Sequence, residues 1–243
     1  VTEGGLVEGL AHKYILYSQY YRNYQLFLCP SPMMEGDFTK MCGVDDDKVI
    51  RAGYPRNIYQ KYFEPIATFD HDILAAKGLD ESYKIAVYAP TFRQNLSEDT
   101  FHLAIPDIEK LIEVCKRQKI LFVFKMHPFM ENEYAYLKMK EKYEDCPYLL
   151  FWDNRDDIYE IIDKIDLAVI DYSSIFTDFI SAGVPHFIRY VFDYEETVQN
   201  LEHDYKEVTT GQMCYSFEEL LQSIETYRDR DDTKGIDRIS NLY

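Results

Sequence analysis

The sequence predicts an α/β fold in which a parallel sheet is flanked by helices. Short apolar runs alternate along the chain with segments whose apolar residues recur at helical spacing. Several runs are nearly continuous in Val, Ile, Leu and Phe, which is typical of strands that are covered on both faces. This alternation of strands and helices indicates βαβ units, and therefore a parallel sheet.

Seven runs are expected to be strands, at residues 25–29, 48–52, 84–89, 120–126, 148–151, 167–170 and 186–191. Helical spacing predicts helices at residues 107–118, 131–142, 175–182 and 217–227. The charged stretch 228–232 should precede a closing helix at 236–242. We place a domain boundary near residues 64–80, so that residues 1–64 end one α/β domain and residues 65–243 form a second, nearly complete one.

Composition indicates a folded domain with an acidic surface. Lys and Arg number 26 against 43 Asp and Glu, which gives a formal net charge of −17 over 243 residues. Such a chain repels nucleic acid and anionic lipid on average, so an anionic substrate requires a local basic pocket. No apolar run approaches the roughly 20 residues of a membrane-spanning helix. Five scattered Cys without a CxxC pair favour a reducing cytoplasm over a disulfide or zinc framework.

The start of the chain carries two Glu and no basic cluster within residues 1–9, unlike a secretory signal. It is also an unusual place for a domain to begin. We therefore expect this sequence to be a piece of a longer protein.

Candidate ligand-binding residues follow the strands, because ligands of open parallel sheets bind beyond the carboxyl ends of the strands. After residues 84–89, Thr91 and Arg93 could hold phosphate oxygens; a turn with an exposed arginine is an equal alternative. After the run that starts at 120, Lys125 and His127 point to the same side of an extended chain. A lone histidine is more often structural, but here the neighbouring Lys125 and the rigid Pro128 favour donation or protonation at a phosphate leaving group.

Asp171, Ser173 and Ser174 follow residues 167–170 and directly precede a predicted helix. Unpaired N–H groups and partial positive charge at a helix start make an anion cradle, although a serine there could simply cap its own helix. Asp178 and Asp193 suit ribose or polyol hydroxyls, with a solvated carboxylate as the default alternative.

A weaker signal follows residues 48–52, where Gly53 and Pro55 predict a shaped loop that presents Arg56 and Asn57. The sequence has no P-loop, GxGxxG, GxSxG or HExxH pattern, which argues against the enzyme classes that these motifs mark. The remaining histidines have no neighbours at ligand spacing. We expect neither a metal nor a cofactor.

Four segments occur in a characteristic order: Gly-Tyr-Pro-Arg-Asn at 53–57, Tyr-Ala-Pro-Thr-Phe-Arg at 88–93, Lys-Met-His-Pro at 125–128 and Asp-Tyr-Ser-Ser at 171–174. In this order and spacing they resemble the CDP-glycerol glycerophosphotransferase family, which makes teichoic acids and related capsule polymers. The similarity extends from about residue 26 to 227 and includes Gly-Val-Pro at 183–185 and Phe-Asp-Tyr at 192–194.

The resemblance implies a GT-B architecture, with the end of an N-terminal Rossmann-like lobe in residues 1–64 and a donor-binding C-terminal lobe in residues 65–243. It also implies a reaction in which the hydroxyl of a lipid-linked acceptor or growing polymer attacks the β-phosphorus of a CDP-polyol and CMP leaves. Glycerol phosphate is the expected group. The expected location is the cytoplasm, at the inner face of the bacterial membrane, which the protein would reach through parts outside this chain.

His127 matches the family histidine that assists the leaving phosphate, so it is the expected catalytic residue. Arg93, Ser173 and Ser174 match donor-phosphate contacts, and the two aspartates match polar positions around the donor. The full expected donor site comprises Arg56, Thr91, Arg93, Lys125, Asp171, Ser173, Ser174, Asp178 and Asp193. We expect Arg93, Lys125, His127 and the start of the helix after Ser174 to share one pocket that holds a diphosphate.

Two departures leave alternatives open. The family's first histidine lies in a Trp-His-Gly-Thr-like segment that this sequence lacks; it would lie in preceding sequence or be missing from this relative. Ile58 after Asn57 replaces the family's commoner aspartate. Because a fold does not fix the chemistry, a glycosyltransferase with a sugar-nucleotide donor and the same architecture is one alternative. A non-catalytic nucleotide-binding module is the other.

Overall fold

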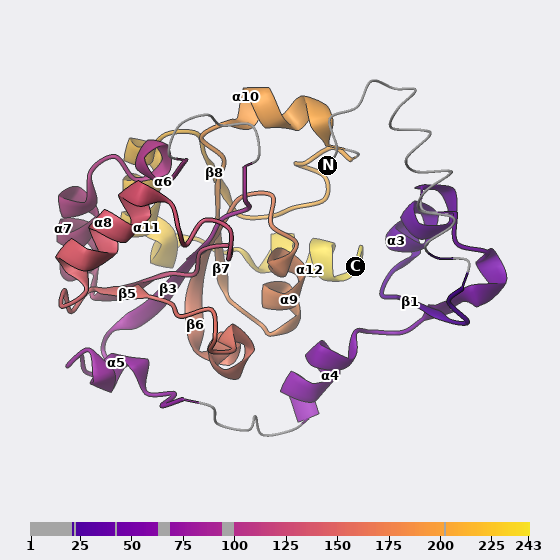
Figure 1. Cartoon of the computed structure of the whole chain (residues 1–243), viewed down its shortest axis with the longest axis horizontal. Coiled ribbons are helices and arrows are strands. Elements are labelled where there is room, and N and C mark those ends of the chain that lie inside the picture. Colours follow the sequence, from indigo (N-terminus) through magenta and orange to yellow (C-terminus); the bar gives the residue numbers. More distant parts are fainter. Residues whose placement is uncertain (1–20, 22, 42, 63–68, 94–99, 202) are drawn as a thin grey trace.

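The computed structural model describes residues 21, 23–41, 43–62, 69–93, 100–201 and 203–243 (Figure 1). Its largest element is a six-stranded, fully parallel sheet. The strands are β3 (Lys84–Ala89), β4 (Ile120–Phe124), β5 (Leu149–Phe151), β6 (Ile165–Ile170), β7 (His186–Tyr190) and β8 (Gln212–Cys214). The parallel α/β fold expected from the sequence is therefore confirmed.

The strand order, β5-β4-β3-β6-β7-β8, has a switch point beside its central strand. The chain runs outward from β3 through β4 to β5, and then returns to place β6 on the other side of β3. This is the order of a doubly wound sheet, whose ligand crevice lies where the strand order reverses. The carboxyl ends of β3 and β6 should therefore border the crevice.

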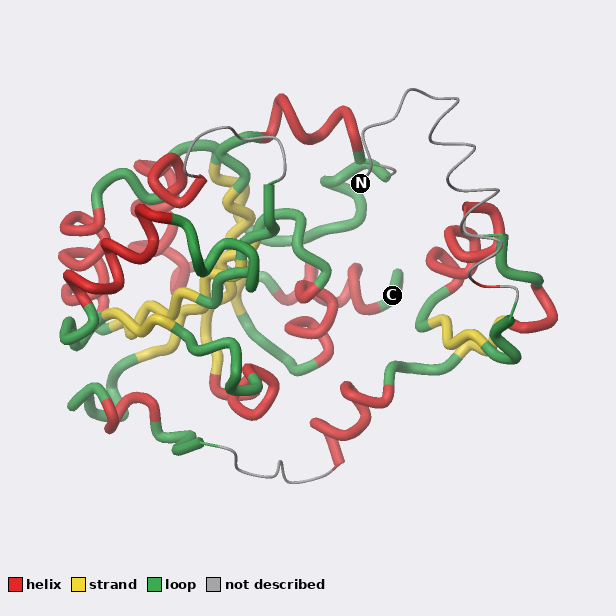
Figure 2. Tube along the Cα trace, in the orientation of Figure 1, coloured by secondary structure: helices red, strands yellow, loops and turns green. Residues whose placement is uncertain are grey.

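Helices cover both faces of the sheet (Figures 1 and 2). The side chains of each strand alternate between two buried clusters; in β3, for example, Ala86 and Tyr88 belong to one and Ile85 and Val87 to the other. The first cluster packs against α6 (Thr100–Ala104), α7 (Ile108–Gln118), α8 (Tyr134–Tyr143) and α11 (Phe217–Thr226). The second packs against α5 (Ile73–Ala76), η4 (Ile158–Lys164), α9 (Ile175–Ser181) and α12 (Thr233–Ser240).

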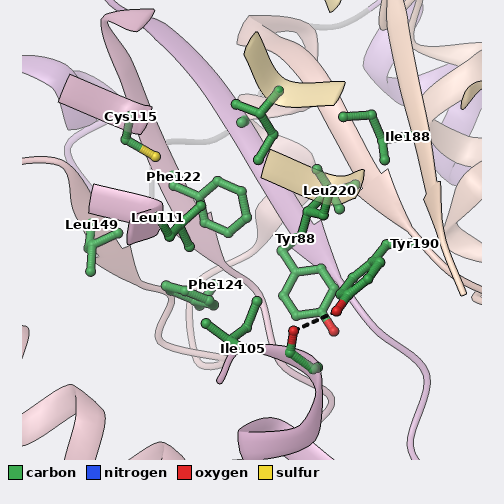
Figure 3. Close-up of a cluster of buried hydrophobic side chains, with 14 of the residues drawn as sticks. Tyr88, Ile105, Leu111, Cys115, Phe122, Phe124, Leu149, Ile188, Tyr190 and Leu220 are labelled. Atoms are coloured by element: carbon green, nitrogen blue, oxygen red, sulfur yellow. Dashed lines mark hydrogen bonds between the residues drawn. The ribbon is translucent and has the colours of Figure 1, made fainter. Parts of the chain in front are cut away.

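Figure 3 shows the first cluster, in which aromatic rings from the strands fill the space beneath the helices. Tyr190 of β7 reaches across this core and donates a hydrogen bond from its hydroxyl to the carbonyl oxygen of Ala104, at 2.6 Å. A buried hydroxyl without an acceptor costs free energy. Because Ala104 is the last residue of α6, this hydrogen bond also holds the end of α6 against the sheet.

A smaller unit precedes the sheet and lies to one side of it (Figure 1). In this unit β1 (Phe27–Cys29) pairs in parallel with β2 (Val49–Arg51). The connection contains α3 (Pro32–Gly36), η2 (Asp37–Met41) and η3 (Asp46–Lys48). We call residues 27–51 the β1–β2 unit. The helix α4 (Pro55–Tyr62) follows it, so the two sheets fall on either side of the expected boundary at residues 64–80.

The structure corrects several expected elements. Residues 53–57 do not form a loop throughout, because α4 begins at Pro55; proline fits the first turn of a helix, where its missing N–H is not needed. The edge strand β8 and the short helices α5, α6, η4 and α10 (Tyr194–Thr197) were not expected. The closing helix begins at Thr233, earlier than position 236. None of the helices in the described part of the chain has the length and apolar character needed to span a bilayer.

Candidate functional site

A cavity of about 780 Å³ lies between the β1–β2 unit and the carboxyl edge of the six-stranded sheet. The β1–β2 unit, the residues that follow it and the start of α4 contribute Met33, Met34, Phe38, Tyr54, Arg56 and Asn57. The large sheet and its helices contribute Tyr172, Ser173, Ser174, Thr177, Asp178, Arg189 and Tyr205. Four expected site residues therefore share this cavity: Arg56, Ser173, Ser174 and Asp178.

One wall of the cavity is held by the carboxylate of Asp178, which is 3% exposed. Its Oδ1 accepts hydrogen bonds from Arg56 Nε at 3.1 Å and Asn57 Nδ2 at 3.0 Å. Its Oδ2 accepts from Arg56 Nη2 at 3.3 Å and from the Tyr159 hydroxyl at 2.6 Å. The solvated-carboxylate alternative is thus wrong for Asp178, which ties α4 and η4 to α9.

The pKa of Arg56 reflects the same contact. Burial alone would lower this pKa, but the hydrogen bond and the charge of Asp178 outweigh burial and raise it. The guanidinium also lies 4.5 Å from the ring centroid of Tyr54, which borders the cavity. Arg56 thus keeps its positive charge at the cavity wall while it is anchored to α9.

The start of α9 borders the cavity through two serines. Ser174 is the N-cap residue, yet its hydroxyl makes no capping hydrogen bond. The Ser173 N–H donates to Asp171 Oδ1 at 3.1 Å. Within the described ranges, no hydrogen bond uses the Ser174 hydroxyl or the backbone N–H groups of Ser174 and Ile175. The capping alternative for the Ser174 side chain is therefore wrong, and these donors can serve a bound anion.

Behind this wall, Asp171 joins the loops that follow β3 and β6. Asp171 is 1% exposed, and its carboxylate accepts hydrogen bonds from the Thr91 N–H, at 2.9 Å to Oδ1 and 2.8 Å to Oδ2. The Thr91 hydroxyl donates to Oδ1 at 2.8 Å. Arg93 Nη1 donates to Oδ2 of the same carboxylate. The two expected loops therefore meet at the switch point, as the strand order requires.

Arg93 bridges two buried carboxylates. Besides Asp171, it contacts Asp193, with Nε–Oδ2 and Nη2–Oδ1 distances of 2.7 and 3.2 Å. Its side chain is 9% exposed, so the exposed-arginine alternative is wrong. Asp193 is likewise buried rather than solvated. Rings of Tyr172 and Phe192 lie 5.2 and 5.7 Å from the guanidinium carbon.

The positive charge of Arg93 and the negative charges of Asp171 and Asp193 stabilise one another. Burial would lower the pKa of Arg93, but Asp171 and Asp193 outweigh it and raise the pKa far above its ordinary value. Burial would raise the pKa of Asp193, but its hydrogen bond to Arg93 lowers it. Thr91, Arg93, Asp171 and Asp193 are not among the residues that line the 780 Å³ cavity. They support its wall from behind.

Lys125 and His127 lie in the loop after β4 (residues 125–128), on the far side of β3 from the cavity. Both side chains are half-buried, whereas Met126 between them is 1% exposed. Burial, and then the positive charge of Lys125, lower the pKa of His127. Burial also lowers the pKa of Lys125 itself.

The single pocket expected from the sequence is therefore divided among three neighbouring groups. The start of α9 lines the cavity, Arg93 lies behind the wall, and Lys125 and His127 follow β4. Since β4 and β6 both pair with β3, their carboxyl ends are about 10 Å apart, or two strand spacings. An extended nucleotide diphosphate can span that distance.

Arg189 in β7 was missed by the sequence reasoning. It lines the cavity but is only 1% exposed. Its Nε donates to the Tyr205 hydroxyl at 2.6 Å, and Nη2 donates to the Asp171 carbonyl oxygen. The Phe176 ring lies 4.4 Å from the guanidinium carbon. An arginine within the otherwise apolar run 187–191 was the available signal, because a buried guanidinium needs several partners.

A second cavity, of about 570 Å³, lies between α4 and η4. Arg56 borders it as well as the first cavity. Inside it, His71 Nε2 and Glu160 Oε2 are 2.6 Å apart. The described residues contain no group of three or more His, Cys, Asp or Glu side chains that could hold a metal ion.

Comparison with known proteins finds the same family that the four sequence motifs resemble. Residues 10–241 match the family described as CDP-Glycerol:Poly(glycerophosphate) glycerophosphotransferase. The chain is 25% identical over 197 residues to the teichoic acid ribitol-phosphate polymerase TarK of Staphylococcus aureus, covering 77% of this chain and 36% of that protein. It is 26% identical over 213 residues to the teichoic acid glycerol-phosphate primase of Bacillus subtilis, covering 86% of this chain and 51% of that protein. The chain thus spans about a third to a half of these relatives.

Solved structures agree at the level of the fold. The wall teichoic acid polymerase TagF superposes with a TM-score of 0.73 and 20% identity, covering 94% of this chain and 55% of that one. A UDP-GlcNAc 2-epimerase from Methanocaldococcus jannaschii superposes with a TM-score of 0.54 and 13% identity, covering 89% of this chain and 59% of that one. The likeness to TagF confirms the GT-B type of fold. With its match over residues 10–241, the chain belongs to the CDP-glycerol:poly(glycerophosphate) glycerophosphotransferase family.

Proposed function

We propose that the intact protein transfers a polyol phosphate from a CDP-polyol to the hydroxyl of an acceptor and releases CMP. Family membership supports the reaction class, and relatives named for glycerol phosphate and for ribitol phosphate support a polyol as the transferred group. Glycerol phosphate is our first choice. The acceptor would be a lipid-linked primer or a growing polymer, met at the cytoplasmic face of the membrane through parts of the protein outside this chain.

The observation that carries the proposal is the start of α9 at the cavity wall. Ser173 and Ser174 border a space of about 780 Å³, which suits a nucleotide-sized ligand. The N–H groups and hydroxyls there favour an anion such as a diphosphate, and the Arg56 guanidinium, paired with Asp178, borders the same cavity. The strong overall negative charge of the chain makes such a local arrangement necessary.

The donor would extend from the start of α9 across the end of β3 toward the loop after β4. There, Lys125 would balance charge on the β-phosphate, and His127 would lie near the oxygen that leaves with CMP. Arg93, Thr91, Asp171 and Asp193 would act indirectly, because their hydrogen bonds fix the two loops against each other. Catalysis of phosphoryl transfer rests mainly on such positioning and on charge stabilisation.

Product analysis tests the proposal. The intact protein is incubated with CDP-glycerol and a polyol-phosphate acceptor, and the released nucleotide is identified by mass spectrometry. Release of CMP supports transfer of the polyol phosphate. Release of CDP would contradict it and favour a glycosyltransferase type of cleavage. Binding of the nucleotide without turnover would favour a non-catalytic module instead.

A further inference from the structure

The ring of His127 is fixed by a hydrogen bond from the main chain. The backbone N–H of Phe129 donates to Nδ1 of His127, with 3.2 Å between the two nitrogens. A nitrogen that accepts a hydrogen bond carries a lone pair, so the proton of the neutral ring lies on Nε2. The Met130 N–H closes this turn onto the His127 carbonyl oxygen at 2.8 Å. The local backbone therefore selects one tautomer.

The surroundings of His127 disfavour protonation of both of its ring nitrogens. A proton on Nδ1 would point at the Phe129 N–H, and two donors cannot share that contact. The centroids of the Phe92 and Phe129 rings lie 5.8 and 5.1 Å from that of the imidazole and hold the ring in place by packing. Lys125 lies close enough to lower the pKa of His127.

The charged groups of the neighbouring elements do not favour a positively charged His127 ring. The carboxylates near Lys125 are those of Glu131 and Asp157, and both act on the pKa of the lysine. Glu131 Oε1 accepts a hydrogen bond from Asn154 Nδ2 at 2.6 Å. Among the ion pairs of the described residues, none includes His127.

Other histidines in the same chain provide an internal contrast. His71 lies 2.6 Å from a Glu160 oxygen, and His203 lies 3.2 Å from an Asp37 oxygen. His186 has an Asp232 oxygen at 3.6 Å. In each of these pairs a carboxylate can accept a hydrogen bond from a protonated ring. His127 instead accepts a hydrogen bond from the Phe129 amide N–H, and the positive charge of Lys125 lowers its pKa.

We propose that His127 acts in the transfer as a neutral imidazole, held as the Nε2–H tautomer by the Phe129 amide, and stabilises the leaving group by hydrogen bonding without giving up its proton. The inference rests on the proposed function and assigns Phe129 a positioning role through its backbone. It replaces proton donation by His127 with electrostatic stabilisation, which fixed hydrogen-bond donors provide efficiently.

The chemistry balances without a proton from His127. The bond between the β-phosphorus and the bridging oxygen breaks, and both electrons stay on that oxygen of CMP. A phosphate monoester has a second pKa of about 6, so CMP can leave as a dianion near neutral pH. The Nε2–H group and the Lys125 ammonium stabilise the developing charge. The oxygen of the acceptor hydroxyl forms the new bond to the β-phosphorus, and the proton of that hydroxyl passes to solvent.

Nitrogen NMR of the intact protein, labelled with ¹⁵N at histidine, tests the tautomer directly. The His127 resonances are assigned by comparison with His127→Gln. At pH 7 we expect one protonated nitrogen, Nε2, and one unprotonated nitrogen, Nδ1. A doubly protonated ring, or a proton on Nδ1, would overturn the inference whatever the activity is.

Two substitutions then test the chemical role. Glutamine retains an N–H donor on a side chain of similar reach but cannot transfer a proton, whereas alanine has neither property. In CMP release from CDP-glycerol, we expect His127→Gln to stay within about tenfold of the wild type and His127→Ala to lose about a hundredfold or more. Equal losses in both variants would contradict a hydrogen-bonding role. Failure of the wild-type protein to release CMP would instead contradict the proposed function itself.

Discussion

Arg56 in α4 and Asp178 in α9 form an ion pair with a 3.1 Å Nε–Oδ1 distance, although 122 positions separate them in the chain. Asn57 and Tyr159 donate to the same carboxylate. The pair therefore connects the helix that follows the β1–β2 unit with the helix whose start borders the main cavity. Any ligand at the start of α9 depends on this connection for the shape of its site.

Asp178→Asn should destabilise the protein measurably. Asparagine keeps the shape of the side chain, but it removes the negative charge and turns one acceptor into a donor facing Arg56 and Tyr159. We expect a loss of about 1–3 kcal/mol in the free energy of unfolding, measured by urea denaturation. Glu35→Gln removes a carboxylate from the more exposed pair with Arg51 and should cost less than about 1 kcal/mol. Equal effects of the two substitutions would contradict the structural role of Asp178.

Arg93→Met should cost more, and the cost should depend on pH. The substitution leaves two buried carboxylates without their cation, which costs about 3 kcal/mol or more near pH 7. Arg51→Met, in an exposed pair, is the matched control.

The sign of this pH dependence follows from the carboxylates. With Arg93 present, the depressed pKa of Asp193 adds stability above the ordinary pKa of aspartate, near 4, and this stability is lost as the pH falls through the depressed value. Without Arg93, burial dominates and raises the carboxylate pKa, which destabilises the variant most at high pH. The deficit of Arg93→Met in urea denaturation should therefore shrink from pH 7 to pH 5. A deficit that grows toward pH 5 would refute this interpretation.

Ser174→Ala should separate ligand binding from helix capping. Since the Ser174 hydroxyl makes no capping bond, the substitution should change the free energy of unfolding by less than about 0.5 kcal/mol. Ser216 does cap its helix, accepting from the Glu219 N–H at 3.2 Å, so Ser216→Ala should cost about 1 kcal/mol. Calorimetry with CDP-glycerol should show weaker binding for Ser174→Ala alone. Unchanged affinity in that variant would remove its hydroxyl from the donor site.

Lys125→Met should raise the pKa of His127. The lysine charge opposes protonation of the ring, so its removal relieves one of the two causes that lower this pKa, and burial remains. A pH titration of the His127 ring resonances by NMR, in wild type and variant, gives both values. A pKa that is unchanged or lower in Lys125→Met would show that the two side chains do not interact as described.

Local sequence signals were sufficient for most of the sheet. The apolar runs of β3, β4 and β7 and the helical spacing of α7, α9 and α11 depend only on burial of one or two faces, so the pattern itself predicts the element. The strand β8 was missed because three residues at a sheet edge carry little pattern. The helix α4 was read as a loop because Pro55 fits a turn and a first helical turn equally well.

The partners of the site residues could not be predicted in the same way. That Arg93, Asp171 and Asp193 lie near the ends of neighbouring strands follows from the sheet, but their mutual contacts span up to 100 positions and depend on side-chain geometry. Local sequence could not show that Asp178 faces Arg56 rather than solvent. Arg189 has no motif around it, and only the packed structure reveals its contacts with Tyr205 and Asp171.

A crystal structure of the intact protein with CDP-glycerol is the most direct test of the donor site. We predict the diphosphate within hydrogen-bonding distance of the start of α9, at Ser173 and Ser174, with the polyol end directed toward His127. Nucleotide bound instead in the cavity between α4 and η4, or with its diphosphate away from α9, would contradict the proposed donor site.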